Sequence, residues 1–345
     1  FSYTSAQSMA FDHNRGCLLT DFLRKRGADC RTYIPGRMGE GYGLNPAAVR
    51  LLAGQGVTLI VTVDCGITAV EEAALCRELG VDLIVTDHHE CKDRLPQAVA
   101  VVDPHRKGDG YPHRDLSGVG VAFKLAAALA GDQETVLREY ADLVCLGTVA
   151  DVMPLRGENR TFVTRGLASL RQTRRPGLKS LMAQSGCTPE SLSAGSIGFV
   201  LAPRINAAGR LEHASLALRL LLAEDLGEAE ELAQKRGEAV ASRLCSLNKQ
   251  RQDIELEIHQ QVEEMLAGQD APEAIVLSDP NWHQGVVGIV ASRIAEEFCC
   301  PTFLICLEGD RGKASSRSYG GFNLFASLTQ LSDLLESYGG HELAA

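Results

Sequence analysis

Two short apolar runs, each followed directly by polar side chains, constrain the fold of this 345-residue chain more than any other feature. Residues 59–63 lead into Asp64, and residues 83–86 lead into the triplet Asp87-His88-His89. Continuous runs rich in Ile and Val are typical of strands that are covered on both faces within a parallel sheet. The sequence therefore predicts two buried strands that end in acidic and imidazole groups.

The segment between the two runs, residues 69–79, has apolar side chains at helical spacing, and Gly80 follows it as a stop signal. A strand, a helix and a second strand form a βαβ unit, whose right-handed crossover makes the strands parallel. The polar groups after the two strands then emerge at the same carboxyl edge of the sheet, where open α/β sheets bind ligands.

A third apolar segment, residues 141–149, is followed by Asp151, and its pattern leaves open whether it is a strand or a helix. Carboxylates from separate segments, paired histidines and no thiolate at ligand spacing favour Mn²⁺ or Mg²⁺ over structural zinc. For Asp64 alone, an ordinary turn or helix cap is the alternative. Three polar groups at the end of a buried strand, in contrast, need partners.

Composition limits the class of protein. A hydrophobic content of 45% and a length of 345 residues suit two α/β domains with proper cores. The net charge of -10 argues mildly against a nucleic-acid partner. An enzyme needs basic residues only along its substrate groove, however, so the local placement of Arg and Lys decides more than the net charge. The 11 cysteines contain no C-x-x-C pair, which indicates reduced thiols. With no apolar window of about 18 residues, we expect no membrane span and a cytoplasmic location.

Several segments carry residue types that bind phosphates, and each also has an ordinary structural explanation. Arg37 lies in a glycine-rich loop, 36–43, that is equally explained as a turn. Ser117 and Gly118 open a helix whose free N–H groups suit an anion, although close helix packing also explains the glycine. A further segment contains Arg204, Asn206 and Arg210. Its planar guanidinium groups suit phosphate oxygens, and surface ion pairs with Glu212 are the alternative.

The remaining patterns predict the outline of the chain. Residues 222–267 have near-continuous helical character, and no glycine lies between Gly237 and Gly268. A helix of about 30 residues here would span about 45 Å, which suits a strut between two domains. We further expect helices at 18–27 and 288–298 and strands at 30–34, 98–102, 274–277 and 302–306.

These segments also resemble a known family. The motifs at 62–67, 86–89 and 147–151 are similar, in order and spacing, to those of the DHH phosphoesterase superfamily and of its RecJ single-strand-specific exonucleases. The resemblance covers residues 17–345, with further matches at 35–44, 102–105, 116–124, 203–210 and 339–345. It implies an α/β fold in which a parallel-sheet DHH domain is joined by a long helix to a smaller α/β DHH-associated domain. The expected boundaries are 1–190, 191–270 and 271–345.

The resemblance also implies roles for individual residues. Asp64, His88 and Asp151 would bind two Mn²⁺ or Mg²⁺ ions, His89 would act at the phosphate or leaving-group oxygen, and Asp87 would orient the histidines. The residues implied in substrate binding are Arg37, Ser117, Gly118, Arg204, Asn206, Arg210, Trp282, Ser316, Arg317 and His341.

Two departures from the family pattern are expected. The family places an Asp-x-Asp motif before the helix that begins near Cys17, whereas this sequence offers Asp12 alone. The DHH-associated domain is expected to be truncated at its C-terminal end, and the family's oligonucleotide-binding domain is absent from the sequence.

The expected function is metal-dependent 5′ to 3′ hydrolysis of single-stranded DNA in recombination and repair. A single-strand-binding protein or a helicase is the expected protein partner. Two alternatives stay open: a phosphodiesterase for oligonucleotides or cyclic dinucleotides, and a catalytically impaired nucleic-acid-binding relative.

Overall fold

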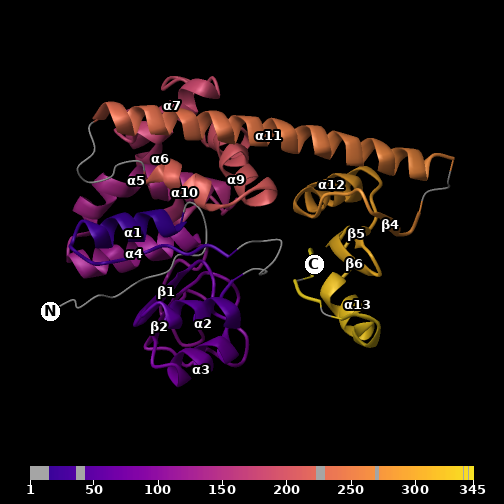
Figure 1. Ribbon diagram of the computed structural model, residues 1–345, viewed down its shortest axis with the longest axis horizontal. Coiled ribbons are helices and arrows are strands. Elements are labelled where there is room, and N and C mark those ends of the chain that lie inside the picture. The colour runs from indigo at the N-terminus through magenta and orange to yellow at the C-terminus, as the bar shows by residue number, and fades with distance from the viewer. Residues whose placement is uncertain (1–14, 36–42, 223–229, 269–271, 337, 341) are drawn as a thin grey trace. The chain divides into compact units, whose positions relative to one another are not determined.

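The computed structural model describes residues 15–35, 43–222, 230–268, 272–336, 338–340 and 342–345 (Figure 1). The chain divides into two compact units, with the division between Leu247 and Asn248. Each unit is described by itself.

The first unit contains a parallel three-stranded sheet in the order β1-β2-β3. Its strands are β1 (Leu59–Val63), β2 (Asp82–Thr86) and β3 (Ala100–Val102). The register pairs Val63 with Thr86 and Thr86 with Val102, so all three strands end at the same level. The residues that follow them, Asp64, Asp87 and Asp103, therefore begin at one edge of the sheet.

The predicted βαβ unit is confirmed. Helix α3 (Val70–Glu78) connects β1 to β2, and α2 (Pro46–Gly54) packs against α3 (Figure 1). A small core holds this part together through Val49, Ile60, Ala73, Leu83 and Val85. Thr62 and Thr86 are also fully buried within the sheet. The Thr86 hydroxyl donates to the Thr62 carbonyl oxygen at 2.6 Å, so its burial leaves no unmet donor.

Helices supply the rest of the first unit and its larger core. They are α1 (Arg15–Arg24), α4 (Gly118–Ala130), α5 (Gln133–Ala150), α6 (Gly157–Leu170), α7 (Pro176–Gln184), α8 (Ala194–Ser196), the π-helix η1 (Ile197–Leu201), α9 (Ala202–Leu211) and α10 (Ser215–Leu221). Edge-to-face aromatic pairs join α1 to α5 (Phe22 and Tyr140) and α4 to α6 (Phe123 and Phe162).

The segment at 141–149 is helical, which settles a question that the sequence left open. It forms the second half of α5, a helix of 18 residues that begins at the N-cap Asp132, whose carboxylate accepts from Thr135 N at 3.1 Å. Residues 141–148 are all buried, so the helix lacks the polar face that usually reveals helical periodicity.

The predicted strand at 30–34 is wrong. These residues have no regular secondary structure. The Cys30 carbonyl oxygen instead accepts a hydrogen bond from Arg24 Nε at 3.1 Å, so a side chain takes the place of a neighbouring strand.

Helix α11 (Glu230–Leu266) confirms the predicted long helix and, at 37 residues, exceeds the expected length. The division between the two units falls within it. Its apolar side chains recur at helical spacing and are buried at Val240, Leu244, Leu247, Ile258 and Val262.

The second unit contains a sheet with strands β4 (Ile275–Asp279), β5 (Thr302–Glu308) and β6 (Arg311–Arg317). Strands β4 and β5 are parallel, and β6 runs antiparallel to β5. Helix α12 (Gln284–Glu297) connects β4 to β5 and packs on β5 and β6 (Figure 1). The short helices α13 (Leu324–Gln330) and η2 (Ser332–Leu334) follow.

The α/β fold class is confirmed, and so are the predicted strands and helix of the second unit, with somewhat different bounds. No helix among the described residues is both long enough and apolar enough to cross a bilayer.

Candidate metal centre

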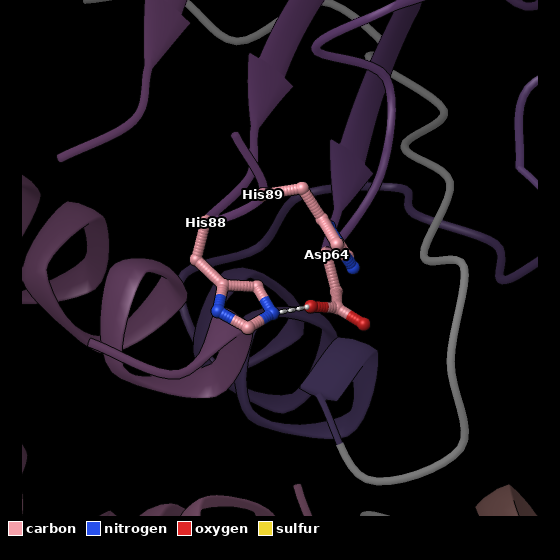
Figure 2. A group of neighbouring side chains, drawn as sticks. All are labelled: Asp64, His88 and His89. Carbon is pink, nitrogen blue, oxygen red and sulfur yellow. Dashed lines mark ion pairs between the residues drawn. The ribbon is translucent and has the colours of Figure 1, made fainter. Parts of the chain in front are cut away.

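Asp64, His88 and Asp151 converge at the carboxyl edge of the first sheet. His88 Nε2 lies 2.8 Å from Asp64 Oδ1 and 3.3 Å from Asp151 Oδ2. Figure 2 shows the His88 ring and the Asp64 carboxylate pointing toward each other. Asp64 directly follows β1, His88 lies two residues after the end of β2, and Asp151 is the C-cap of α5, so three segments contribute.

The backbone at Asp64 adopts an unusual conformation that aims its side chain inward. Asp64 has φ +66°, in the left-handed region that Asp and Asn enter more readily than other non-glycine residues. Its N–H still donates to the Thr86 carbonyl oxygen at 2.9 Å, so the ladder extends one residue past β1. The turn places the carboxylate in a site where the residue is only 8% exposed.

The start of α4 packs directly against this carboxylate. A Cβ atom on Gly118 would lie 2.2 Å from Asp64 Oδ1, so only glycine permits the approach. Ser117, the N-cap, is fully buried, and its Oγ accepts from Gly120 N at 3.2 Å and lies 2.9 Å from Thr148 Oγ1 on α5. The structure thus brings Gly118 into the site, while Ser117 links α4 to α5.

Asp87 orients the two histidines. Its Oδ1 accepts hydrogen bonds from the backbone N–H groups of His88 at 2.8 Å and His89 at 3.3 Å, and lies 2.6 Å from His89 Nδ1. Its Oδ2 accepts from Ile67 N at 2.9 Å. Burial alone would raise the pKa of Asp87, but the hydrogen bonds from His89, Ile67 and His88 hold that pKa below its usual range. The carboxyl is therefore ionised, and His89 Nδ1 is assigned as the donor.

His89 is the accessible member of this group. Its side chain is 59% exposed, whereas the side chain of His88 is 8% exposed. Its Nδ1 is directed to the Asp87 carboxylate, which fixes the orientation of the ring.

The donor set fits a divalent metal ion. Within the described residues, the groups of Asp64, His88 and His89 each offer a ligand atom, and these atoms lie within 4.8 Å of one another. Carboxylate oxygen and imidazole nitrogen are suited to ions of the Mn²⁺ type, and the cluster contains no thiolate. We call Asp64, His88, His89 and Asp151 the Asp–His centre.

Sequence reasoning assigned no role to Asp103, which also lies at this edge. It is 2% exposed, and its Oδ1 accepts from His105 N at 2.7 Å. Burial raises the pKa of Asp103, and the charge of Asp87 raises it further. The signal was present in the sequence, because Asp103 follows an apolar run just as Asp64 and Asp87 do.

Helix α9 carries the predicted Arg204, Asn206 and Arg210, all half-buried. Arg204 Nη1 donates to the Val200 carbonyl oxygen at 2.7 Å. Glu212, which the alternative explanation names as an ion-pair partner, accepts from Arg243 Nε at 2.9 Å.

In the second unit, the predicted Trp282 lies in the turn before α12. The residue is 5% exposed, and its Nε1 donates to Gln261 Oε1 on α11 at 2.8 Å. A large apolar ring with one donor is stabilised in such a position, so the indole anchors the turn before α12.

Ser316 and Arg317 lie at the end of β6. Ser316 is 2% exposed, and its N–H donates to the Ala345 carbonyl oxygen at 2.7 Å. Arg317 Nε donates to Ser292 Oγ on α12 at 2.8 Å, and its Nη1 donates to the Ser316 carbonyl oxygen at 2.7 Å. Three other predicted positions lie outside the described residues: Asp12, Arg37 and His341.

A second unusual backbone conformation follows Asp151. Val152 has φ +56° and occupies the position after the C-cap of α5. Val152 N donates to Val149 O at 3.1 Å and Met153 N donates to Thr148 O at 3.3 Å, which is the Schellman pattern that ends many helices. Glycine is usual there, and a left-handed conformation costs other residues about 1–2 kcal/mol.

Comparison with known proteins agrees with this fold. The family model described as "DHH family, N-terminal domain" matches residues 15–148, and the "DHHA1 domain" model matches residues 271–345. A structure of exonuclease RecJ bound to manganese is 37% identical, with a TM-score of 0.84, over 98% of this chain and 84% of that chain. RecJ of Thermus thermophilus in complex with Mn²⁺ is 35% identical, also with a TM-score of 0.84, over 98% of this chain and 48% of that chain.

The single-stranded-DNA-specific exonuclease RecJ of Bacillus subtilis is 45% identical over 326 residues, which are 94% of this chain and 40% of that protein. The chain spans about half the length of the curated relatives it matches, with 59% coverage of the Salmonella typhimurium protein.

The α/β fold and the Asp-His-His edge define a member of the DHH family, and the chain belongs to that family. Within it, the chain is RecJ-like, since a RecJ structure matches it along nearly its whole length.

Proposed function

We propose that this protein is a metal-dependent 5′ to 3′ exonuclease that hydrolyses phosphodiester bonds of single-stranded DNA in recombination and repair. The observation that carries the proposal is the convergence of Asp64, His88 and Asp151 from three segments on one edge of the sheet. The relatives named as single-stranded-DNA-specific exonucleases support the substrate.

The Asp–His centre would hold Mn²⁺ or Mg²⁺ through Asp64, His88 and Asp151. A bound divalent ion neutralises the phosphate and lowers the pKa of the attacking water. Asp64 and Asp151 contribute the negative charge that attracts the ion, and burial of Asp64 and His88 reduces competition from bulk water.

His89 is the group that we assign to the substrate. Its Nδ1 is directed to the Asp87 carboxylate at 2.6 Å, which fixes the orientation of the ring. The exposed Nε2 then donates to a phosphate oxygen or to the leaving-group oxygen. Asp87 acts as a positioning residue in this scheme because it contacts both histidines.

Basic and hydroxyl side chains complete the proposal. Arg204 and Arg210 on α9, and Ser316 and Arg317 on β6, position the sugar-phosphate backbone. We assign residues 1–190 to the catalytic domain, 191–270 to the connection and 271–345 to the substrate-binding domain. A single-strand-binding protein or a helicase as partner, and a cytoplasmic location, belong to the same proposal.

The test uses the purified protein and a single strand of about 20 nucleotides, labelled at either end, with a duplex and a dinucleotide as comparisons. With Mn²⁺ we expect mononucleotides to be released from the 5′ end of the single strand, and a chelator should stop the release. Preferential cleavage of the dinucleotide would favour an oligonucleotide phosphodiesterase. Binding of single strands without turnover at any Mn²⁺ or Mg²⁺ concentration would overturn the enzymatic proposal.

A further inference from the structure

Two large apolar side chains beside the Asp–His centre are almost fully exposed. Val152, directly after Asp151, is 88% exposed, and Phe199 in η1 is 87% exposed. Both belong to the first unit. Single exposed apolar residues are ordinary, but these two adjoin the same helix end, and each occupies an irregular backbone.

The last turn of α5 connects the two residues in space. It ends at Val149 and Ala150, before the C-cap Asp151. A Cβ atom on Gly198 would lie 3.6 Å from Val149 Cγ1, so the η1 turn that bears Phe199 packs on this part of α5. Val152 is held over the same turn by its hydrogen bond to the Val149 carbonyl oxygen at 3.1 Å.

The exposure of Val152 brings no benefit to folding. A β-branched residue in the left-handed conformation is strained, and a side chain that is 88% exposed gains little from burial in return. Glycine would end the helix with the same hydrogen bonds and without the strain. The side chain at this position therefore acts outside the core of the folded unit.

The π-helical turn at Phe199 has a cause in the sequence. Pro203 has no N–H, so it cannot donate to the Phe199 carbonyl oxygen four residues earlier. The Ala202 N–H instead reaches the Ile197 carbonyl oxygen, which makes the wider turn. Wide turns of this kind occur often at functional sites.

A positively charged side chain is hydrogen-bonded to the backbone of the turn that bears Phe199. Arg204 Nη1 donates to the carbonyl oxygen of Val200, the residue after Phe199, at 2.7 Å. An aromatic ring beside a guanidinium group is the combination with which proteins hold single-stranded nucleic acids, because bases stack on the ring and the cation attracts the backbone.

We infer that Phe199 and Val152 form a stacking platform for a nucleobase of the single strand whose phosphate lies at the Asp–His centre. The inference rests on the proposed function and adds to it a subsite that recognises a base rather than a phosphate. Since every base presents a π face, the platform tolerates any sequence and requires an unpaired strand.

The first experiment measures binding by fluorescence anisotropy, with Ca²⁺ in place of Mn²⁺, for strands that carry one abasic position at each site in turn. On an intact strand, Phe199→Ala should weaken binding about 10-fold, within the range of aromatic truncations at stacking sites. Phe199→Trp should bind at least as well as the wild type. One abasic position should weaken wild-type binding to a similar extent and abolish the effect of Phe199→Ala.

The second experiment uses Val152→Gly, whose two effects have opposite signs. Removing the strain should raise the melting temperature, while removing the apolar side chain should weaken binding about 3-fold. Misfolding cannot produce this combination. The matched control is Leu129→Ala, at an apolar residue on α4 that is 51% exposed. This variant should leave strand binding unchanged.

An equal effect of Phe199→Ala on all strands, abasic or not, would overturn the inference, as would no effect at all. A change in oligomeric state instead of strand binding would assign the platform to a protein interface. These failures are distinct from failure of the proposed function, in which the wild type itself hydrolyses no single strand.

Discussion

The two units contain the same βαβ topology and use it differently. In the first unit, the turn after β1 carries Asp64, whose carboxylate enters a ligand site. In the second unit, the turn after β4 carries Trp282, which is buried against α11, and His283, whose Nδ1 accepts from Gly285 N at 3.1 Å as the N-cap of α12. The parallel pair therefore supplies an edge, and the residue types at that edge decide its chemistry.

The charges at the two sheets differ in the same way. The edge of the first sheet gathers acidic and imidazole groups, which suit a cation, at Asp64, Asp87, His88 and Asp103. The end of β6 in the second sheet presents hydroxyl and guanidinium groups, which suit an anion, at Ser316 and Arg317. Three substitutions test this contrast between a cation edge and an anion strand, and a fourth tests the pH dependence of the helix cap in the second unit.

The largest effect is expected for Asp64→Asn. Losing the charged ligand should reduce Mn²⁺-dependent hydrolysis about 1000-fold, since a metal ion contributes several kcal/mol to the transition state. Asn also tolerates the left-handed backbone, so the melting temperature should stay near that of the wild type. Single-turnover rates and Mn²⁺ titration calorimetry provide the readouts. Asp93→Asn, at a side chain that is 97% exposed, is the control, and equal rates for the two variants would contradict the cation edge.

Gly118→Ala should have the next largest effect, although glycine offers no side-chain donor. Its Cβ would lie 2.2 Å from Asp64 Oδ1, so the carboxylate must move. A displacement of this size at a reacting centre reduces rates about 100-fold. Single-turnover hydrolysis should be compared with that of Gly110→Ala, where a Cβ meets nothing within 4 Å. A fully active Gly118→Ala enzyme would show that the helix start is not tied to the site.

Arg317→Lys tests the anion strand. Loss of the planar fork should raise KM for single-stranded DNA about 10-fold with little change in kcat, and Mn²⁺ affinity should not change. Steady-state kinetics and calorimetry separate the two quantities. Arg311→Lys, at the other end of β6 with a side chain that is 78% exposed, is the matched control. If kcat and Mn²⁺ affinity fell together, the second sheet would share the role of the first.

The smallest effect concerns the pH dependence of stability at His283. Burial lowers the pKa of His283 below its ordinary value of 6.5. A group with a lowered pKa in the folded state stabilises the protein above its unfolded pKa, and this contribution is lost as pH falls through the folded pKa. His283→Asn keeps a capping side chain that does not titrate.

The melting temperatures of the wild type and of His283→Asn should therefore diverge as the pH falls from about 7.5 to about 5. Over this range the free energy of unfolding of the wild type should fall by about 1 kcal/mol more than that of the variant. A constant difference across this range would show that the cap does not depend on neutral His283.

The sequence predicted the parts of the site that local patterns determine. Asp64 and His88 were found because each follows a buried apolar run, and the parallel register then brings them together. The same rule applies to Asp103, which follows a strand of only three residues. A run this short gives a weak pattern, and Asp103 was assigned no role from the sequence.

Features that depend on tertiary packing were not predictable. The sequence contains no sign that Val152 adopts φ +56°, because the left-handed position of a Schellman motif is usually occupied by glycine. The sequence does not reveal that the Trp282 indole donates to Gln261, because the two residues lie on different segments. The strand expected at 30–34 failed because Arg24 takes the carbonyl oxygen that a neighbouring strand would need.

The contact between Gly118 and Asp64 affects how substitution data on this protein should be interpreted. In a saturation screen for activity, position 118 is expected to be as intolerant as a metal ligand, although glycine contributes no side-chain atom to the reaction. Intolerance at such a position measures free space rather than chemistry. A screen that scores abundance and activity separately would place Gly118 beside Asp64 and apart from the glycines of ordinary turns.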